Sequence, residues 1–385
     1  MWCCSVLCAG ATLHADDWPL VRGDILGTGV AKCAVPAQPE VLWKYSAAAD
    51  AGFDSTAVIA NGIVYAGDNA GTLHAIRLAD GSAVWKKEFA DSGFDAGGAI
   101  ENGRLYIGDM NGTIYCLAAA DGKEIWKQQL EGEVYAGPTI IGHDVLFTCE
   151  AGTLSCRNTA DGAERWKFHI EAPLRCTPTI SGGRVALAGC DSRLHLIDVA
   201  GGKEVDTVAI DAPTGSTPAM SKDQVFFGTE GGTFYAIDTA AGGAKKPAVA
   251  WTYHDPQRNQ PVRAAAAVNE QVVVYGSQSK AIYGLERASG TEKWKLSTRA
   301  RVESSPVIAE DRVVAATTSG KMYLLDVASG DVRWESDFGG NFVASPAVVD
   351  GKIVIGNSDG TLYCLGSKSN ATDKKATENA QAAKK

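Results

Sequence analysis

The sequence predicts an all-β protein: an eight-bladed β-propeller of four-stranded antiparallel blades, with the ring closed by an N-terminal outer strand. Two observations support this prediction. Tryptophans recur every 40 to 45 residues, and the intervals between them contain turn signals rich in glycine. The 43 glycines are spread along all 385 positions together with Val, Ile, Tyr and Thr, a distribution typical of many short strands joined by tight turns.

The repeat carries tryptophan at one fixed place in seven copies: Trp43, Trp85, Trp126, Trp166, Trp251, Trp294 and Trp334. The eighth copy has Asp206 there, in Gly-Gly-Lys-Glu-Val-Asp where another copy has Asp-Gly-Lys-Glu-Ile-Trp. We expect each indole to pack over the gap between two blades, where such a ring buries roughly 150–250 Å². A structural role is therefore favoured over a cofactor role, and the junction at Asp206 is expected to be weaker or covered in another way.

One complete copy, residues 96–126, divides into four predicted strands at 97–100, 104–108, 113–117 and 124–127. Asn102-Gly103 between the first two is the signal of a type I′ hairpin, because both central positions of that turn need positive φ. Four short antiparallel strands at this period match a propeller blade, and no window has a helical period.

The two ends of the repeat region predict a closed ring. The last copy, residues 344–365, has only three strands, whereas residues 40–46 form an isolated fourth strand that contains Trp43. We expect this strand to complete the last blade, which leaves only short, protected edges. Seven blades with one degenerate extra copy is the alternative.

Outside the propeller, residues 40–365, three segments are expected. Residues 1–15 form a short apolar run that ends in small residues, which indicates a signal peptide and export to the periplasm or cell envelope. A buried N-terminal segment is the alternative, and the missing basic region leaves the true start codon open. Residues 16–39 are expected to pack on the propeller wall, and the polar residues 366–385 to be a disordered tail.

Neither a transmembrane helix nor a nucleic-acid partner is expected. The N-terminal run is too short to span a bilayer, and no later segment approaches ~18 continuous apolar residues. No clear lipobox accompanies Cys3, Cys4 or Cys8, so a lipid anchor is not supported. The formal net charge of −9 argues against binding to a phosphate backbone.

Two sequence patterns resemble a known repeat. The turn and outer strand at 120–126 (Ala-Asp-Gly-Lys-Glu-Ile-Trp) and the third strand at 232–238 (Gly-Thr-Phe-Tyr-Ala-Ile-Asp) are similar to the pyrroloquinoline-quinone-like repeat. That repeat occurs in quinoprotein dehydrogenases and in non-enzymatic propellers similar to BamB, a scaffold of the outer-membrane assembly machinery. The resemblance covers residues 40–365, and a repeat indicates fold rather than activity.

For an enzyme, the resemblance implies pyrroloquinoline quinone (PQQ), Ca²⁺ and an adjacent pair of disulfide-bonded cysteines. The only adjacent pair is Cys3-Cys4 in the predicted leader, and no Ca²⁺ ligands can be placed. We therefore expect no catalytic residue, cofactor or metal, and a monomeric periplasmic scaffold for protein partners of the envelope or outer-membrane assembly. The alternatives are a PQQ- and Ca²⁺-dependent dehydrogenase, a sensor of a small ligand, and a purely structural or cell-surface role.

Binding is expected at the channel mouth, the face where first strands begin and second strands end. Repeat positions vary most there, and the candidate binding residues are Asp54, Asp68, Asp95, Asp109, Tyr135, Arg175, Arg263, Glu303 and Asn357. A solvated mouth without a ligand is the alternative. The long connection at residues 251–261 is a further candidate contact loop on this face.

Three cysteines are also expected near the mouth, within two neighbouring blades: Cys149, Cys176 and Cys190. In an exported protein they could form one disulfide, either Cys176–Cys190 or Cys149–Cys190. Free thiols or a metal site of three cysteines are the alternatives.

Overall fold

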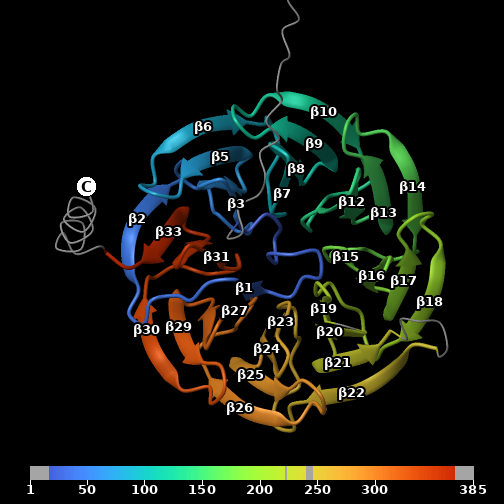
Figure 1. The fold of residues 1–385 in the computed structure, drawn as a ribbon, viewed down its shortest axis with the longest axis vertical. Helices are drawn as coiled ribbons and strands as arrows, with labels where there is room; N and C mark the ends of the chain where they lie inside the picture. The colour runs from blue at the N-terminus through green and yellow to red at the C-terminus, as the bar shows by residue number, and fades with distance from the viewer. Residues whose placement is uncertain (1–16, 222, 240–245, 369–385) are drawn as a thin grey trace, which may run out of the picture.

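The computed structural model describes residues 17–221, 223–239 and 246–368. The predicted leader and nearly all of the predicted tail lie outside these residues. Within them the chain forms eight antiparallel sheets arranged in a ring, and no helix occurs (Figure 1). The all-β class, the eight blades and the four strands per blade are thereby confirmed.

The two inner strands of each blade are short and almost entirely buried. The innermost strands are β3 (Val58–Ala60), β7 (Ala99–Glu101), β11 (Thr139–Ile141), β15 (Thr179–Ser181), β19 (Ala219–Ser221), β23 (Ala267–Val268), β27 (Val307–Ala309) and β31 (Ala347–Val349). The second strands are β4 (Ile63–Gly67), β8 (Arg104–Gly108), β12 (Asp144–Cys149), β16 (Arg184–Gly189), β20 (Gln224–Gly228), β24 (Val272–Ser277), β28 (Arg312–Ala316) and β32 (Lys352–Gly356).

The two outer strands complete each blade. The third strands are β5 (Thr72–Arg77), β9 (Thr113–Ala118), β13 (Thr153–Asn158), β17 (Arg193–Asp198), β21 (Thr233–Asp238), β25 (Ala281–Glu286), β29 (Lys321–Asp326) and β33 (Thr361–Gly366). The outermost strands are β6 (Ala83–Glu88), β10 (Glu124–Gln129), β14 (Glu164–His169), β18 (Glu204–Ala209), β22 (Ala248–His254), β26 (Glu292–Ser297), β30 (Val332–Asp337) and β2 (Glu40–Ser46). We number the blades 1 to 8 from β3–β6 to β31–β33 with β2.

The N-terminal strand closes the ring as predicted. Strand β2 pairs antiparallel with β33 of the last blade, with Trp43 opposite Cys364. The Trp43 indole is buried and donates from Nε1 to the Leu78 carbonyl of blade 1 at 2.9 Å. At the inner end of the same seam the Ser345 amide donates to Thr56 Oγ1 at 3.1 Å. The first and last blades are therefore joined at both ends of the seam.

Indoles bridge the neighbouring blades. Trp126 Nε1 donates to the carbonyl of Thr159 in the next blade at 3.1 Å. Corresponding bonds run from Trp43, Trp85, Trp166, Trp251 and Trp294. At the junction that has Asp206, Arg184 Nη1 donates to the Thr239 carbonyl at 3.0 Å. Arg104 makes the equivalent bond at the junction of Trp126, so Arg184 does not replace the indole, and a weaker junction at Asp206 stays a prediction.

The first part of the segment before the propeller lies inside the ring rather than on the propeller wall, contrary to our expectation. Residues 18–31 run along the inner edges of the innermost strands and cross the centre of the ring (Figure 1). They make backbone hydrogen bonds with Ile59, Ile100, Ile180, Met220, Val268 and Ile308, which belong to six different blades, and β1 (Val30–Ala31) adds a parallel strand to β27. The unpaired inner edges of the blades attract this backbone, because each offers free amides and carbonyls.

Two side chains fix this channel segment, which we define as residues 17–31. Arg22 is buried, and its guanidinium donates to the carbonyls of Ala266 (3.0 Å), Pro306 (2.7 Å) and Ser305 (3.3 Å). Val21 packs closely against Gly97 and Gly137. A Cβ added to these glycines would lie only 2.8 and 2.1 Å from Val21 Cγ2. The small residues of blades 2 and 3 therefore make room for the segment inside the channel.

Candidate functional site

The channel mouth is formed by residues that follow one another around the ring. Asp54 accepts hydrogen bonds from Asn69 Nδ2 and Ser358 Oγ. Burial raises the pKa of Asp95, and the negative charge of Asp54 raises it further. Glu303 accepts from Gln278 Nε2 at 2.9 Å. The mouth is thus acidic at blades 1, 2 and 7.

Three of the predicted rim residues are not available to a ligand. Asp68, Asp109 and Asn357 are buried, with at most 2% of each exposed. Asp68 Oδ1 accepts from the Thr72 amide at 2.7 Å, Asp109 Oδ1 from the Thr113 amide at 2.8 Å, and Asn357 Oδ1 from the Thr361 amide at 2.9 Å. These side chains close the turn after the second strand, which is a structural role.

The opposite side of the mouth has two arginines, each oriented by a glutamate. Arg175 donates from Nε to Glu150 Oε1 and lies 5.8 Å from the centroid of the Tyr135 ring. Arg263 donates from Nε and Nη2 to the two carboxylate oxygens of Glu230, at 2.8 and 3.1 Å. These ion pairs raise the pKa of both arginines. The sequence did not single out either glutamate, although Glu150 directly follows β12 and Glu230 lies two residues after the end of β20.

A pocket of about 390 Å³ lies between these two arginines, lined by Arg175, Cys190, Pro213, Gly215, Glu230 and Arg263. It exists because blade 5 has Gly215 at the start of its first strand, where blades 4 and 6 have Arg175 and Arg263. A Cβ at Gly215 would already lie 3.2 Å from Arg175 Cβ. A longer side chain would fill the pocket.

The three candidate cysteines are free thiols in the structure. Cys149 and Cys176 are fully buried, and Cys190 is partly exposed at the pocket, with its Sγ 3.6 Å from the Thr214 carbonyl. Burial raises the pKa of all three thiols, to about 12 for Cys176. The predicted disulfide remains a prediction for a thiol titration.

The candidate contact loop is anchored by a buried carboxylate. Asp255 accepts from Lys295 Nζ at 2.8 Å and from the Tyr283 hydroxyl at 2.5 Å. Burial alone would raise the pKa of Asp255, but these two bonds outweigh it and hold the value at about 2. The loop after β22 is therefore fixed to blade 6 at its start.

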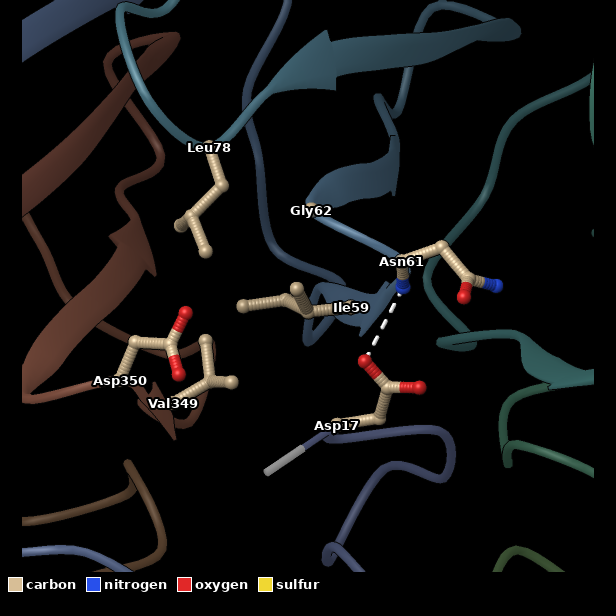
Figure 2. A pocket seen from close by; sticks show the side chains of 7 residues that line it. All are labelled: Asp17, Ile59, Asn61, Gly62, Leu78, Val349 and Asp350. Carbon is tan, nitrogen blue, oxygen red and sulfur yellow. Dashed lines mark hydrogen bonds between the residues drawn. The ribbon is translucent and has the colours of Figure 1, made fainter. Parts of the chain in front are cut away.

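A second pocket lies on the opposite face, where the channel segment begins. It measures about 300 Å³ and is lined by Asp17, Ile59, Asn61, Gly62, Leu78, Val349 and Asp350. Figure 2 shows Asp17 and Asp350 on either side of Ile59, with Asp17 Oδ1 accepting from the Asn61 amide at 3.0 Å. Asp17 thus ties the channel segment to blade 1.

The sequence matches the family described as outer membrane protein assembly factor BamB over residues 70–168 and 150–376. The chain belongs to this family. A comparison with curated proteins finds no match. BamB-family membership agrees with the resemblance to PQQ-like repeats, and the matched residues cover most of the propeller.

Solved structures share the fold at low identity. BamB from Moraxella catarrhalis has a TM-score of 0.73 at 16% identity, covering 86% of this chain and 100% of that one. Quinohemoprotein alcohol dehydrogenase from Comamonas testosteroni has a TM-score of 0.76 at 14% identity, covering 94% of this chain and 82% of that one. The computationally designed Ika8 protein has a TM-score of 0.73 at 15% identity, covering 84% and 98%. Enzymes, a BamB and a designed protein share this ring, so the fold does not decide the function.

The residues in the channel do not fit the PQQ and Ca²⁺ of the dehydrogenases. Calcium takes six to eight oxygen ligands, whereas residues 17–221, 223–239 and 246–368 hold no group of three or more His, Cys, Asp or Glu side chains suited to a metal. Val21 and Arg22 also occupy the space between the innermost strands. The same described residues contain no helix able to cross a membrane.

Proposed function

We propose that this BamB-family protein is a non-catalytic scaffold of the bacterial cell envelope that binds a protein partner at its channel mouth. The family description supports a role in outer-membrane protein assembly. The observation that carries the proposal is the contrast between the centre of the channel and its mouth. The channel segment fills the centre by bonding to six blades, while the mouth has a pocket and a rim of mixed charge.

The rim has the composition of a protein-binding surface. Arginine and tyrosine are enriched at protein interfaces. Arg175 and Arg263 are exposed at the mouth, and Arg175 lies over the ring of Tyr135. Both guanidinium groups are held by glutamates, so little side-chain freedom is lost when a partner binds. The anchored loop after β22 extends the surface to blade 6.

Site-specific photo-cross-linking in the native host tests this proposal. A photoreactive residue would replace Asp95 or Glu303 at the mouth, and Asp350 at the opposite face as the matched control. We expect one protein adduct from the two mouth positions and none from Asp350. Adducts from Asp350 alone, or no adduct from any position with export intact, would overturn the proposal.

A further inference from the structure

The pocket above Gly215 has guanidinium N–H donors that make no hydrogen bond within the described protein. Arg175 uses only Nε for Glu150, and Arg263 uses Nε and Nη2 for Glu230. Among the described residues, nothing bonds to the two Nη atoms of Arg175 or to Nη1 of Arg263. Three guanidinium nitrogens, from two arginines on two blades, are therefore available as donors at one pocket.

The two arginines are also close enough to repel each other. The charge of Arg175 lowers the pKa of Arg263, against the larger rise that Glu230 causes. A single negative group placed between two guanidinium groups relieves such repulsion and accepts hydrogen bonds from both. The blade between them contributes no side chain at this level, because its residue is Gly215.

We propose that this pocket binds a carboxylate, received between Arg175 and Arg263 above Gly215. A planar carboxylate matches the fork of a guanidinium. A polyanion is disfavoured, because Glu150 and Glu230 balance the two arginines and the rest of the rim has Asp54, Asp95 and Glu303. The inference deepens the proposed function, on which it rests for its biological meaning: the carboxylate would belong to an acidic segment of the partner. A free dicarboxylate is the other source of the same group.

The repeat itself provides the variant that tests the pocket. Other blades have an acidic residue where blade 5 has Gly215, namely Asp54, Asp95 and Glu303, and the φ of Gly215 is not positive. Gly215→Glu should therefore be tolerated by the backbone and place a carboxylate of the protein's own between the arginines. Gly215→Gln fills the same volume without the charge and is the matched control.

The experiment measures binding to the purified protein, without its partner, by fluorescence anisotropy and calorimetry. The probes are a labelled, C-terminally amidated peptide with a single Glu side chain (the acidic peptide), its Gln counterpart (the neutral peptide), glutarate, and inorganic phosphate. We expect the acidic peptide or glutarate to bind in preference to the neutral peptide and to phosphate. Loss of one arginine in Arg263→Ala should weaken binding about tenfold, whereas Arg333→Ala on the outer wall should leave it unchanged.

Each outcome has a definite meaning. Binding of the acidic peptide alone supports the site and indicates a partner segment, whereas binding of glutarate supports the site and indicates a small carboxylate. Gly215→Glu should abolish binding and melt at a higher temperature than Gly215→Gln. No binding by either carboxylate probe, equal binding of the neutral peptide, or wild-type binding by Arg263→Ala and Gly215→Glu would overturn the inference. Because no partner is present, failure of this test is distinct from failure of the cross-linking.

Discussion

Gly162 lies directly against the indole of Trp126 in the preceding blade: a Cβ at Gly162 would be 2.8 Å from Trp126 Cδ2. The same contact recurs around the ring at Gly81 with Trp43, Gly122 with Trp85, Gly202 with Trp166, Gly290 with Trp251 and Gly330 with Trp294. The glycine that recurs at this turn of the repeat therefore has two causes. Each of these glycines has a positive φ, and each leaves the indole room to seal the junction.

Gly162→Ala should lower the melting temperature much more than Gly103→Ala. The two glycines have nearly the same φ, +74° and +72°, but a Cβ at Gly103 meets nothing within 4 Å. Both variants pay roughly 1 kcal/mol or more for the left-handed backbone, and only Gly162→Ala also overpacks an indole, at about 1–3 kcal/mol. Calorimetry of the two variants measures the difference. Equal destabilisation would show that the indole contact contributes nothing.

Arg22→Met should destabilise the protein by about 3 kcal/mol or more, measured by thermal or urea unfolding. The substitution keeps the apolar stem but leaves three buried carbonyls without their charged donor, and such bonds contribute roughly 1.5–3 kcal/mol each. Burial lowers the pKa of Arg22 to about 10, so the wild-type side chain is still charged at neutral pH. Arg22→Lys restores the charge and should recover part of the loss. An unchanged stability of Arg22→Met would contradict the placement of the channel segment.

The stabilisation that Asp255 provides should be lost in acid. Its folded pKa, about 2, lies below the unfolded value of about 3.9. The stabilisation is therefore complete above about pH 4 and is lost as the pH falls towards 2. We expect Asp255→Asn to be less stable than the wild type at pH 7, and to lose less melting temperature between pH 5 and pH 2.5. Parallel melting curves for the two proteins across that range would contradict the assignment.

Thiol titration decides whether Cys149, Cys176 and Cys190 are oxidised in the native protein. The structure has them as free thiols, so the unfolded protein should give the same thiol count with and without reductant. In the folded protein only Cys190 of the three should react quickly, because the other two are fully buried. Two additional thiols after reduction would instead support the predicted disulfide.

Most of the fold could be predicted from the sequence, because every blade repeats the same pattern of strands and turns. The four strands expected in residues 96–126 differ from β7 to β10 by at most two residues at any end. Ring closure followed from the isolated strand around Trp43. These features depend on side-chain patterns and turn residues that recur at a fixed period.

The channel segment could not be placed in this way. It occurs once, and it holds to the blades mainly through backbone atoms, which have no sequence signature. The mouth was predicted as a face, but not in detail. Arg175 and Arg263 were expected there, whereas the roles of Glu150 and Glu230 and the empty position at Gly215 depend on contacts between neighbouring blades. The burial of Asp68 and Asp109 was missed because turn-capping and exposed aspartates look alike in a sequence.

A thermal melt of the purified protein with and without PQQ and Ca²⁺ tests the central claim most directly. A ligand that binds only the folded state must raise the midpoint, by ~2.7 kcal/mol of stabilisation at a hundredfold excess over its Kd. A scaffold whose channel is filled by residues 17–31 should show no shift with either ligand. A clear rise with PQQ and Ca²⁺ together would contradict the account and make alcohols and sugars the next substrates to test.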